Sequence, residues 1–107
     1  MKIVLTLGGL DEVRGYMEIL CEQYDDIILR YNRYKNTITL INGDEIKGYS
    51  VASRRDGITA DAAMGIDAEY MTCRSKLTKR IWESQDLVNY LDKIKEHYFT
   101  MTQQTGM

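Results

Sequence analysis

Residues 36–51, NTITLINGDEIKGYSV, decide the fold. Apolar and polar side chains alternate in "NTITLI" and again in "EIKGYSV", which is the pattern of half-buried β-strands. Asn42 and Gly43 stand between the two runs, and both accept the positive φ of a type I′ hairpin turn. We therefore predict two antiparallel strands joined at Asn42 and Gly43.

The segment just upstream extends this hairpin into a meander. Residues 26–34, DIILRYNRY, are predicted to form a third strand with Ile27, Leu29 and Tyr31 on one face. A turn at residues 35–36 would lead from this strand into the hairpin. The middle of the chain is therefore expected to be an antiparallel sheet of three strands.

The N-terminal residues predict a strand and a helix. "KIVLTL", Lys2 to Leu7, is a continuous apolar run typical of a buried, parallel strand. After two glycines, apolar residues recur at three- and four-residue spacing, which predicts a helix of about 13 residues with Asp11 as a cap.

The second half of the chain has fewer regular patterns. Residues 62–67, AAMGID, predict a short buried strand, residues 74–82 a short helix, and Ser84 the start of a final helix. Residues 102–107 form a polar tail. The chain is thus expected to be one domain, 1–107, of the α/β class. Its elements follow the order β-α-β-β-β-β-α-α in a small mixed sheet with an antiparallel meander in the middle.

Composition indicates a globular protein, since 44% of its 107 residues are hydrophobic and 28% are charged. The net charge of -2 gives no overall attraction to nucleic acid or to anionic membranes. Locally, however, residues 27–57 carry six bases and three acids. Two distant cysteines and the absence of a signal-like or membrane-spanning segment predict a cytoplasmic protein with no membrane contact.

Two basic segments are candidates for contact with a partner or with nucleic acid. "RYNRYK" interleaves bases with aromatic rings, as single-strand binding surfaces do, and "CRSKLTKR" gathers four bases in seven residues. Either segment could equally be a solvated face. A single tryptophan before the last helix would serve as a core anchor or as an interface residue. These candidates are Arg30, Arg33, Lys35, Arg74, Lys76, Lys79, Arg80 and Trp82.

Asp67 and Glu69 are the candidates for metal binding that the sequence suggests, and they are weak ones. They follow an apolar run, as the acids that handle Mg²⁺ do in many ATP-driven enzymes. The chain contains no G-x-x-x-x-G-K-[ST] run to hold a phosphate. His97, the single histidine, has no nearby serine or cysteine that indicates a triad. We therefore expect no catalytic residue, no metal and no cofactor.

Lys2 to Thr72 resembles part of the ATPase domain of phage terminase large subunits. The resemblance lies in "ITLINGDEIKGYS" and "SRRDGITADAAMGIDAEYM", where the family has a strand pair around an Asn-Gly turn and an apolar strand ending in Asp-Glu-Ala. The phosphate-binding loop that precedes these strands in the family has no counterpart in this chain, and Ala68 separates the two acids. The matching positions are Asn42, Gly43, Ile46, Gly57, Asp67 and Glu69.

The resemblance and its departures imply a non-enzymatic protein of phage or prophage type. Such a protein would bind and inhibit a nuclease, a helicase or a packaging component, and inhibitors of host defence of the anti-CRISPR kind have a similar profile. An exposed edge strand could also pair across a homodimer. The alternatives are a terminase-derived nucleic-acid or nucleotide binder and, ranked last, a Mg²⁺-dependent phosphohydrolase built on Asp61, Asp67 and Glu69.

Overall fold

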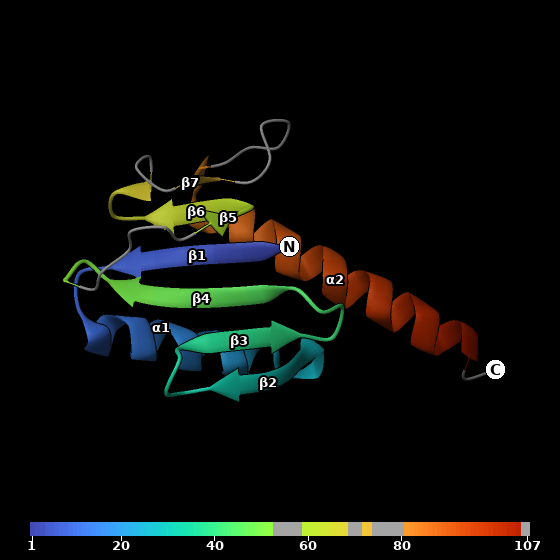
Figure 1. The fold of residues 1–107 in the computed structure, drawn as a ribbon. Helices are drawn as coiled ribbons and strands as arrows, with labels where there is room; N and C mark the ends of the chain where they lie inside the picture. Colours follow the sequence, from blue (N-terminus) through green and yellow to red (C-terminus); the bar gives the residue numbers. More distant parts are fainter. Residues whose placement is uncertain (53–58, 69–71, 74–80, 106–107) are drawn as a thin grey trace.

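A computed structural model describes residues 1–52, 59–68, 72–73 and 81–105 of the chain. It confirms the predicted mixed α/β fold, with a sheet of six strands and two helices (Figure 1). The elements are β1 (Lys2–Leu7), α1 (Leu10–Gln23), the 3₁₀ turn η1 (Asp25–Ile27), β2 (Ile28–Asn32), β3 (Thr37–Leu40), β4 (Glu45–Ser50), β5 (Thr59–Ala60), β6 (Ala62–Gly65), β7 (Thr72–Cys73), β8 (Ile81–Trp82) and α2 (Ser84–Thr105).

The strands of the main sheet lie in the order β2-β3-β4-β1-β6-β8. β1 pairs in parallel with β4 on one side and with β6 on the other, β6 continues in parallel to β8, and β2, β3 and β4 form the predicted antiparallel meander. The short strands β5 and β7 form a separate parallel pair. β1 is therefore the central strand, as its unbroken apolar sequence predicts for a strand buried on both faces.

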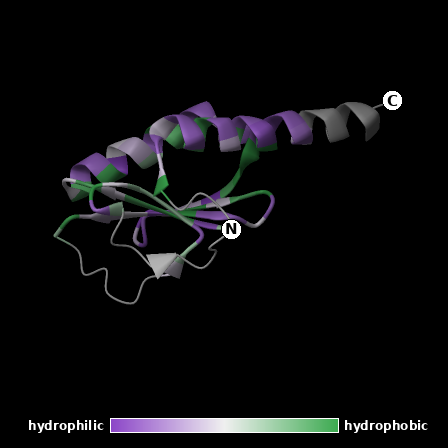
Figure 2. Ribbon diagram, turned by 90° about the horizontal axis from the view of Figure 1, so that it is seen from above, coloured by the Kyte–Doolittle hydropathy of each residue, from purple (hydrophilic) through white to green (hydrophobic). Residues whose placement is uncertain are grey.

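Both helices cover the same face of the sheet (Figure 2). Val13 and Met17 of α1 and Leu87 and Leu91 of α2 are buried in one core cluster with the strand residues that face them. The Tyr24 hydroxyl, just beyond α1, donates a hydrogen bond of 3.1 Å to the Asp92 carboxylate of α2. The strand residues of this cluster are Ile3, Leu5, Ile38, Leu40, Ile46, Ala62 and Met64.

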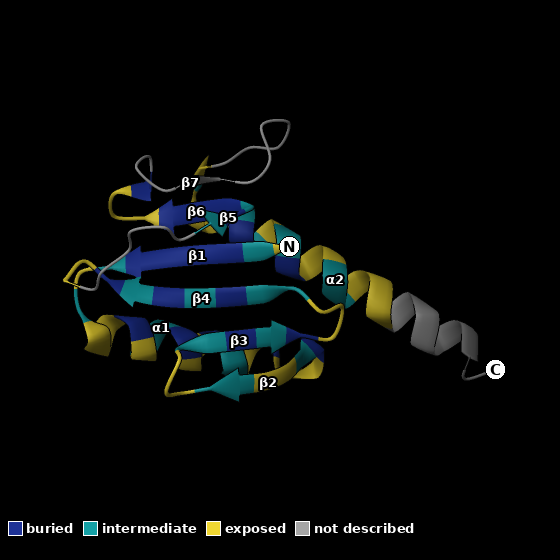
Figure 3. Cartoon of the chain, viewed as in Figure 1, coloured by how far each residue is buried: buried dark blue, intermediate teal, exposed yellow. Residues whose placement is uncertain are grey.

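The opposite face of the sheet is covered only in part. Val4, Thr6 and Ala63 on this face of β1 and β6 are buried, and β5 lies against β1. The same face of β2, β3 and β4 is partly exposed or exposed, as the teal and yellow segments of these strands show in Figure 3. The sheet thus presents a polar surface on the side away from the helices.

The register of β2 differs from the predicted one. Ile27 lies in η1 rather than in the strand, and the pairing with β3 shifts between Ile28 and Arg30. This β-bulge turns Leu29 outward, so that its side chain is 70% exposed, while Ile28 and Tyr31 pack against the core. A strict two-residue alternation cannot reveal an extra residue in one strand, and the prediction that Leu29 shares a face with Ile27 and Tyr31 was therefore wrong.

Four smaller details also differ. Gly43 has a φ of +89° and Asn42 does not have a positive φ, so the turn is a three-residue loop with a left-handed glycine rather than type I′. Gly9 rather than Asp11 caps α1.

Ile81–Trp82 form strand β8 instead of ending a helix, and residues 74–80 lie outside the described residues. The backbone of residues 102–105, predicted as a polar tail, belongs to α2.

Neither of the two described helices combines the length and the apolar character that crossing a bilayer requires.

Candidate functional site

The exposed part of the sheet carries a group of basic side chains, which we call the basic sheet face. It forms a shallow hollow of about 240 Å³ over β2, β3, β4 and the start of β1. On β3 and β4, strand alternation points Thr37, Thr39, Glu45 and Lys47 away from the helices, since the residues between and beside them are buried in the core. The residues that line it are Lys2, Arg30, Asn32, Lys35, Thr37, Thr39, Glu45 and Lys47.

The basic sheet face has a clear positive charge. Lys2, Arg30, Lys35 and Lys47 contribute four cations, against the single carboxylate of Glu45. Within the described ranges, none of the four cations forms a salt bridge. Unpaired cations on one surface attract polyanions, even on a protein whose net charge is negative.

An aromatic ring accompanies these cations. The Lys47 ammonium lies 5.3 Å from the centre of the Tyr49 ring, and both side chains project from the same side of β4. Tyr49 is partly exposed. A ring beside a cation is the arrangement on which unpaired nucleic-acid bases stack.

The hairpin between β2 and β3 divides the predicted "RYNRYK" candidates. Arg30 and Lys35 lie on the basic sheet face, whereas Arg33 lies on the helix side, 5.9 Å above the centre of the Tyr31 ring. The turn is held by the Asn32 side chain, which accepts a hydrogen bond of 3.1 Å from the Lys35 amide, and by Asn36, whose φ is +47°. Arg33 and Lys35 therefore project to opposite sides of the hairpin tip.

Lys2 and Lys47 belong to the basic sheet face but were not among the predicted candidates. Lys2 comes beside β4 through the parallel register, in which Lys2 pairs with Glu45. The alternation of "EIKGYSV" places Lys47 opposite the buried Ile46, so this part of the signal was present in the sequence.

Trp82, the remaining candidate with a described position, lies at the other edge of the sheet. Its ring centre is 5.4 Å from that of Tyr90, with the planes at 54°. Together with Leu7, Met64 and Ile81 it lines a cavity of about 420 Å³, with both polar and apolar walls, at the carboxyl ends of β1, β6 and β8. The four basic candidates Arg74, Lys76, Lys79 and Arg80 lie outside the described residues.

Of the two acids suggested for metal binding, only Asp67 lies within the described residues. Asp67 lies in an exposed turn beyond β6, with a φ of +58°, and Glu69 lies outside the described residues. Asp61 lies at the opposite end of β6, where its carboxylate accepts a hydrogen bond of 2.7 Å from the Lys2 amide. No group of three or more metal-ligating side chains occurs in the described part of the chain.

A second surface lies where α2 extends past the sheet. The apolar stripe of α2 begins with the buried Leu87 and Leu91, continues with the partly buried Ile94, and reaches Tyr98, which is 41% exposed. Ile94 and Tyr98 line a mostly apolar groove of about 280 Å³ together with Ile41, Asn42 and His97. His97 is exposed on this groove.

Comparison of the chain with protein-family models, with curated proteins and with solved structures gives no match.

Proposed function

We propose that this chain is a non-enzymatic binding protein whose ligand is single-stranded nucleic acid, held on the basic sheet face. The observation that carries the proposal is the convergence of Lys2, Arg30, Lys35 and Lys47 on one exposed side of the sheet, where none of them has an acidic partner among the described residues. Phosphates would supply the missing negative charges, and binding would release counterions.

The distribution of charge restricts where a polyanion can bind. The first helix and the turn after it carry most of the acids of the N-terminal segment, and they lie on the far side of the sheet from these cations. Nucleic acid is therefore attracted to one face and repelled from most of the other. This polarity reconciles a local binding surface with a net charge of -2.

A single strand fits this face better than a duplex does. Three adjacent strands span only about 10 Å, at roughly 4.8 Å between neighbours, and they offer no basic helix to enter a major groove. Thr37 and Thr39 have short side chains, so they do not obstruct a strand that lies across the face. Tyr49 offers a ring on which an unpaired base can stack.

Fluorescence anisotropy with a labelled 10-nucleotide single strand tests the proposal. Counting only the four cations of the basic sheet face as phosphate contacts, raising the salt from 50 to 200 mM weakens binding by on the order of 50-fold. The double variant Arg30→Gln/Lys47→Gln lowers the slope of log K against log salt by about 1.4.

Lys93→Gln is the matched control, because Lys93 is exposed on α2, on the far side of the sheet. It leaves the affinity and the salt slope unchanged. Absence of binding at 50 mM salt, or equal losses in Lys93→Gln and in the double variant, would refute the proposal. The fluorescence of Trp82 provides a folding control, since β8 and β2 are the two opposite edges of the sheet.

Inhibition of a protein partner is a second candidate function, favoured by the groove at Ile41, Ile94 and Tyr98. Apolar and aromatic side chains in a groove are typical of interface centres. The partner expected from the terminase resemblance is a nuclease, a helicase or a packaging component. The phage origin and the anti-CRISPR role are hypotheses that depend on the same resemblance. Wild-type protein should inhibit such an enzyme and Tyr98→Asp should not; equal effects of the two proteins would exclude the groove.

A further inference from the structure

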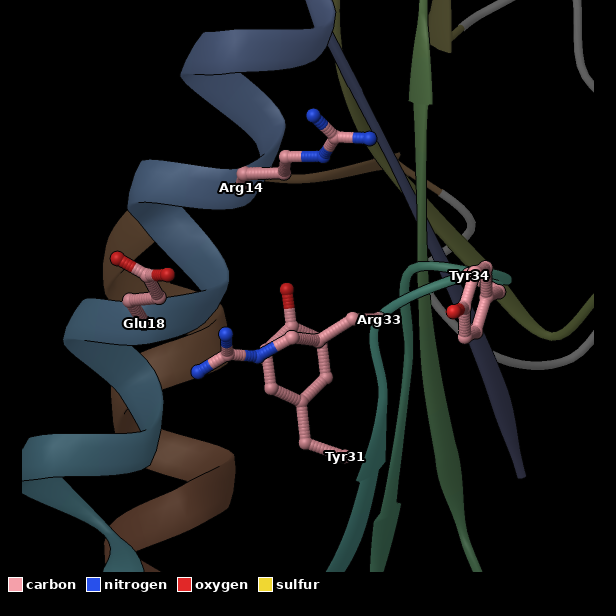
Figure 4. A pocket seen from close by; sticks show the side chains of 5 residues that line it. All are labelled: Arg14, Glu18, Tyr31, Arg33 and Tyr34. Atoms are coloured by element: carbon pink, nitrogen blue, oxygen red, sulfur yellow. The ribbon is translucent and has the colours of Figure 1, made fainter.

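The hairpin tip carries a second group of cations on its other side. Arg14 and Glu18 of α1, Tyr31 of β2, and Arg33 and Tyr34 of the turn line a pocket of about 300 Å³, which we call the helix-side pocket. In Figure 4, Arg14 extends from α1 toward the hairpin, and Arg33 extends back across the Tyr31 ring toward α1. The pocket lies at the same tip that carries Lys35 of the basic sheet face.

The charges of the helix-side pocket leave one positive charge unmatched. Two guanidinium groups face the single carboxylate of Glu18, and within the described residues neither guanidinium forms a salt bridge. The Tyr31 ring holds Arg33 in place by a cation–π contact. Burial raises the pKa of the Tyr31 hydroxyl, as do Cys21 and Glu18, while Arg33 and Arg14 oppose the rise, so the hydroxyl is protonated at neutral pH and can donate.

We infer that a bound single strand continues from the basic sheet face over the hairpin tip and places one phosphodiester in the helix-side pocket, between Arg14 and Arg33. This inference rests on the proposed function. A phosphodiester carries one negative charge, which equals the unmatched charge of the pocket. Its two non-bridging oxygens accept the paired N–H groups of a guanidinium, and the Tyr31 hydroxyl is a further donor.

Tyr34 provides the contact by which the nucleic acid would cross the hairpin tip from the basic sheet face to the helix-side pocket. Its side chain is fully exposed, at 101% of the reference area, between Arg33 and Lys35. A fully exposed ring buries no surface in the fold, but it offers both faces to an unpaired base. A base stacked on Tyr34 would join the phosphate bound near Lys35 to the phosphate bound near Arg33.

Glu18 sets the selectivity of the helix-side pocket. Its carboxylate repels a dianionic terminal phosphate more strongly than a singly charged phosphodiester. An internal phosphate should therefore be preferred to a 5′-phosphate end, and Glu18→Gln should tighten binding of both.

The experiment measures binding of oligothymidylates of 4 and 10 nucleotides to the full chain as salt is varied. Arg14→Gln and Arg33→Gln should each weaken binding of the 10-mer by about 5- to 10-fold and flatten its salt slope by about 0.7, the value for one phosphate contact to a single strand. The 4-mer, which covers only the basic sheet face, should bind wild type and both variants alike. Tyr34→Ala should weaken the 10-mer by about 5- to 100-fold without changing the salt slope, because stacking carries no charge.

Three results would overturn the inference while leaving the proposed function intact. The first is that both arginine variants bind the 10-mer as wild type does, while Arg30→Gln still weakens it. The second is that the 4-mer and the 10-mer lose the same affinity in Arg33→Gln. The third is that poly-glutamate, but not the 10-mer, shifts the Tyr31 ring signals in NMR spectra, which would assign the pocket to an acidic protein. If neither oligonucleotide binds wild type at all, the proposed function fails as well.

Discussion

Gly48 of β4 lies directly beneath Val13 of α1, with no room between them for a methyl group. A Cβ atom on Gly48 would come 2.8 Å from Met17 Cε and closer still to Val13 Cγ1. This contact allows α1 to lie flat against β4 and closes the core on its helical side. The helix and the sheet are therefore matched at a position where only glycine fits.

Gly48→Ala should lower the free energy of unfolding by about 1–3 kcal/mol, because the added methyl group pushes α1 away from the sheet. Urea denaturation followed by circular dichroism measures the loss. Gly15→Ala is the control, since no atom lies within 4 Å of a Cβ there and the helix gains about 0.5–1 kcal/mol from losing a glycine. Combining Gly48→Ala with Val13→Ala should destabilise by less than the sum of the two single changes, and strict additivity would contradict this contact.

The bulge in β2 predicts opposite behaviour for two adjacent side chains. Leu29→Ala should change stability by less than about 0.5 kcal/mol, because Leu29 is exposed, whereas Ile28→Ala should cost about 1–2 kcal/mol. Thermal unfolding of the two variants side by side makes the comparison. A larger loss in Leu29→Ala than in Ile28→Ala would restore the alternation predicted from the sequence.

The hydrogen bond from Tyr24 to Asp92 ties the end of α1 to α2. Tyr24→Phe should lower stability at pH 7 by about 1 kcal/mol, since Asp92 is exposed and water can replace the lost donor. Hydrogen exchange of amides in α2 should speed up in this variant. Unchanged stability and unchanged exchange would show that the bond contributes nothing to the docking of α2.

The same tyrosine predicts how stability depends on alkaline pH. Burial and the hydrogen bond to Asp92 raise the pKa of Tyr24 above its ordinary value of 10.0, so the folded chain holds this proton more tightly than the unfolded chain does. The stabilisation is complete below about pH 10 and is lost as the pH rises toward the raised value. Burial also raises the pKa of Tyr16 and of Tyr31. Urea titrations from pH 8 to 11 should show falling stability, with a smaller fall in Tyr24→Phe.

The contact between Trp82 and Tyr90 predicts a measurable coupling between β8 and α2. A double-mutant cycle with Trp82→Ala and Tyr90→Ala should give about 0.5–1.5 kcal/mol, the range for aromatic pairs. Tyr90→Phe keeps the ring but removes its hydrogen bond to Asp44, so it should show no coupling with Trp82→Ala. If Trp82→Ala coupled to Tyr90→Phe as strongly as to Tyr90→Ala, the coupling would belong to the hydroxyl rather than to the ring contact.

The strong local patterns of the sequence were enough to predict the main elements. The apolar run from Lys2 to Leu7 and the alternation on both sides of Asn42 depend only on neighbouring residues, and both became strands where expected. The type of turn at Gly43 and the bulge at Leu29 depend on how two strands meet, which neither strand encodes alone. For that reason β1, β3 and β4 were predicted correctly, whereas the turn between β3 and β4 and the bulge in β2 were not.

The candidate site was predictable only in part, for a similar reason. Arg30 and Lys35 were identified from their spacing within one segment. Lys2 joins them only because a parallel register brings it beside Glu45, 43 residues later in the chain. Arg33 was grouped with them by sequence, but the turn sends it to the other side of the hairpin, toward Arg14 of α1.

The central position of β1 has a consequence for synthesis. This strand leaves the ribosome well before β4 and β6, the two strands that pair with its edges. One edge stays open until Ser50 of β4 has been added, 43 residues after Leu7, and the other until Gly65 of β6 has been added, 58 residues after Leu7. Nascent chains halted before β6 would expose an apolar strand with a free edge, which is the substrate that chaperones capture and that aggregates recruit. Slow codons after residue 50 should therefore reduce the soluble yield more than slow codons after residue 85.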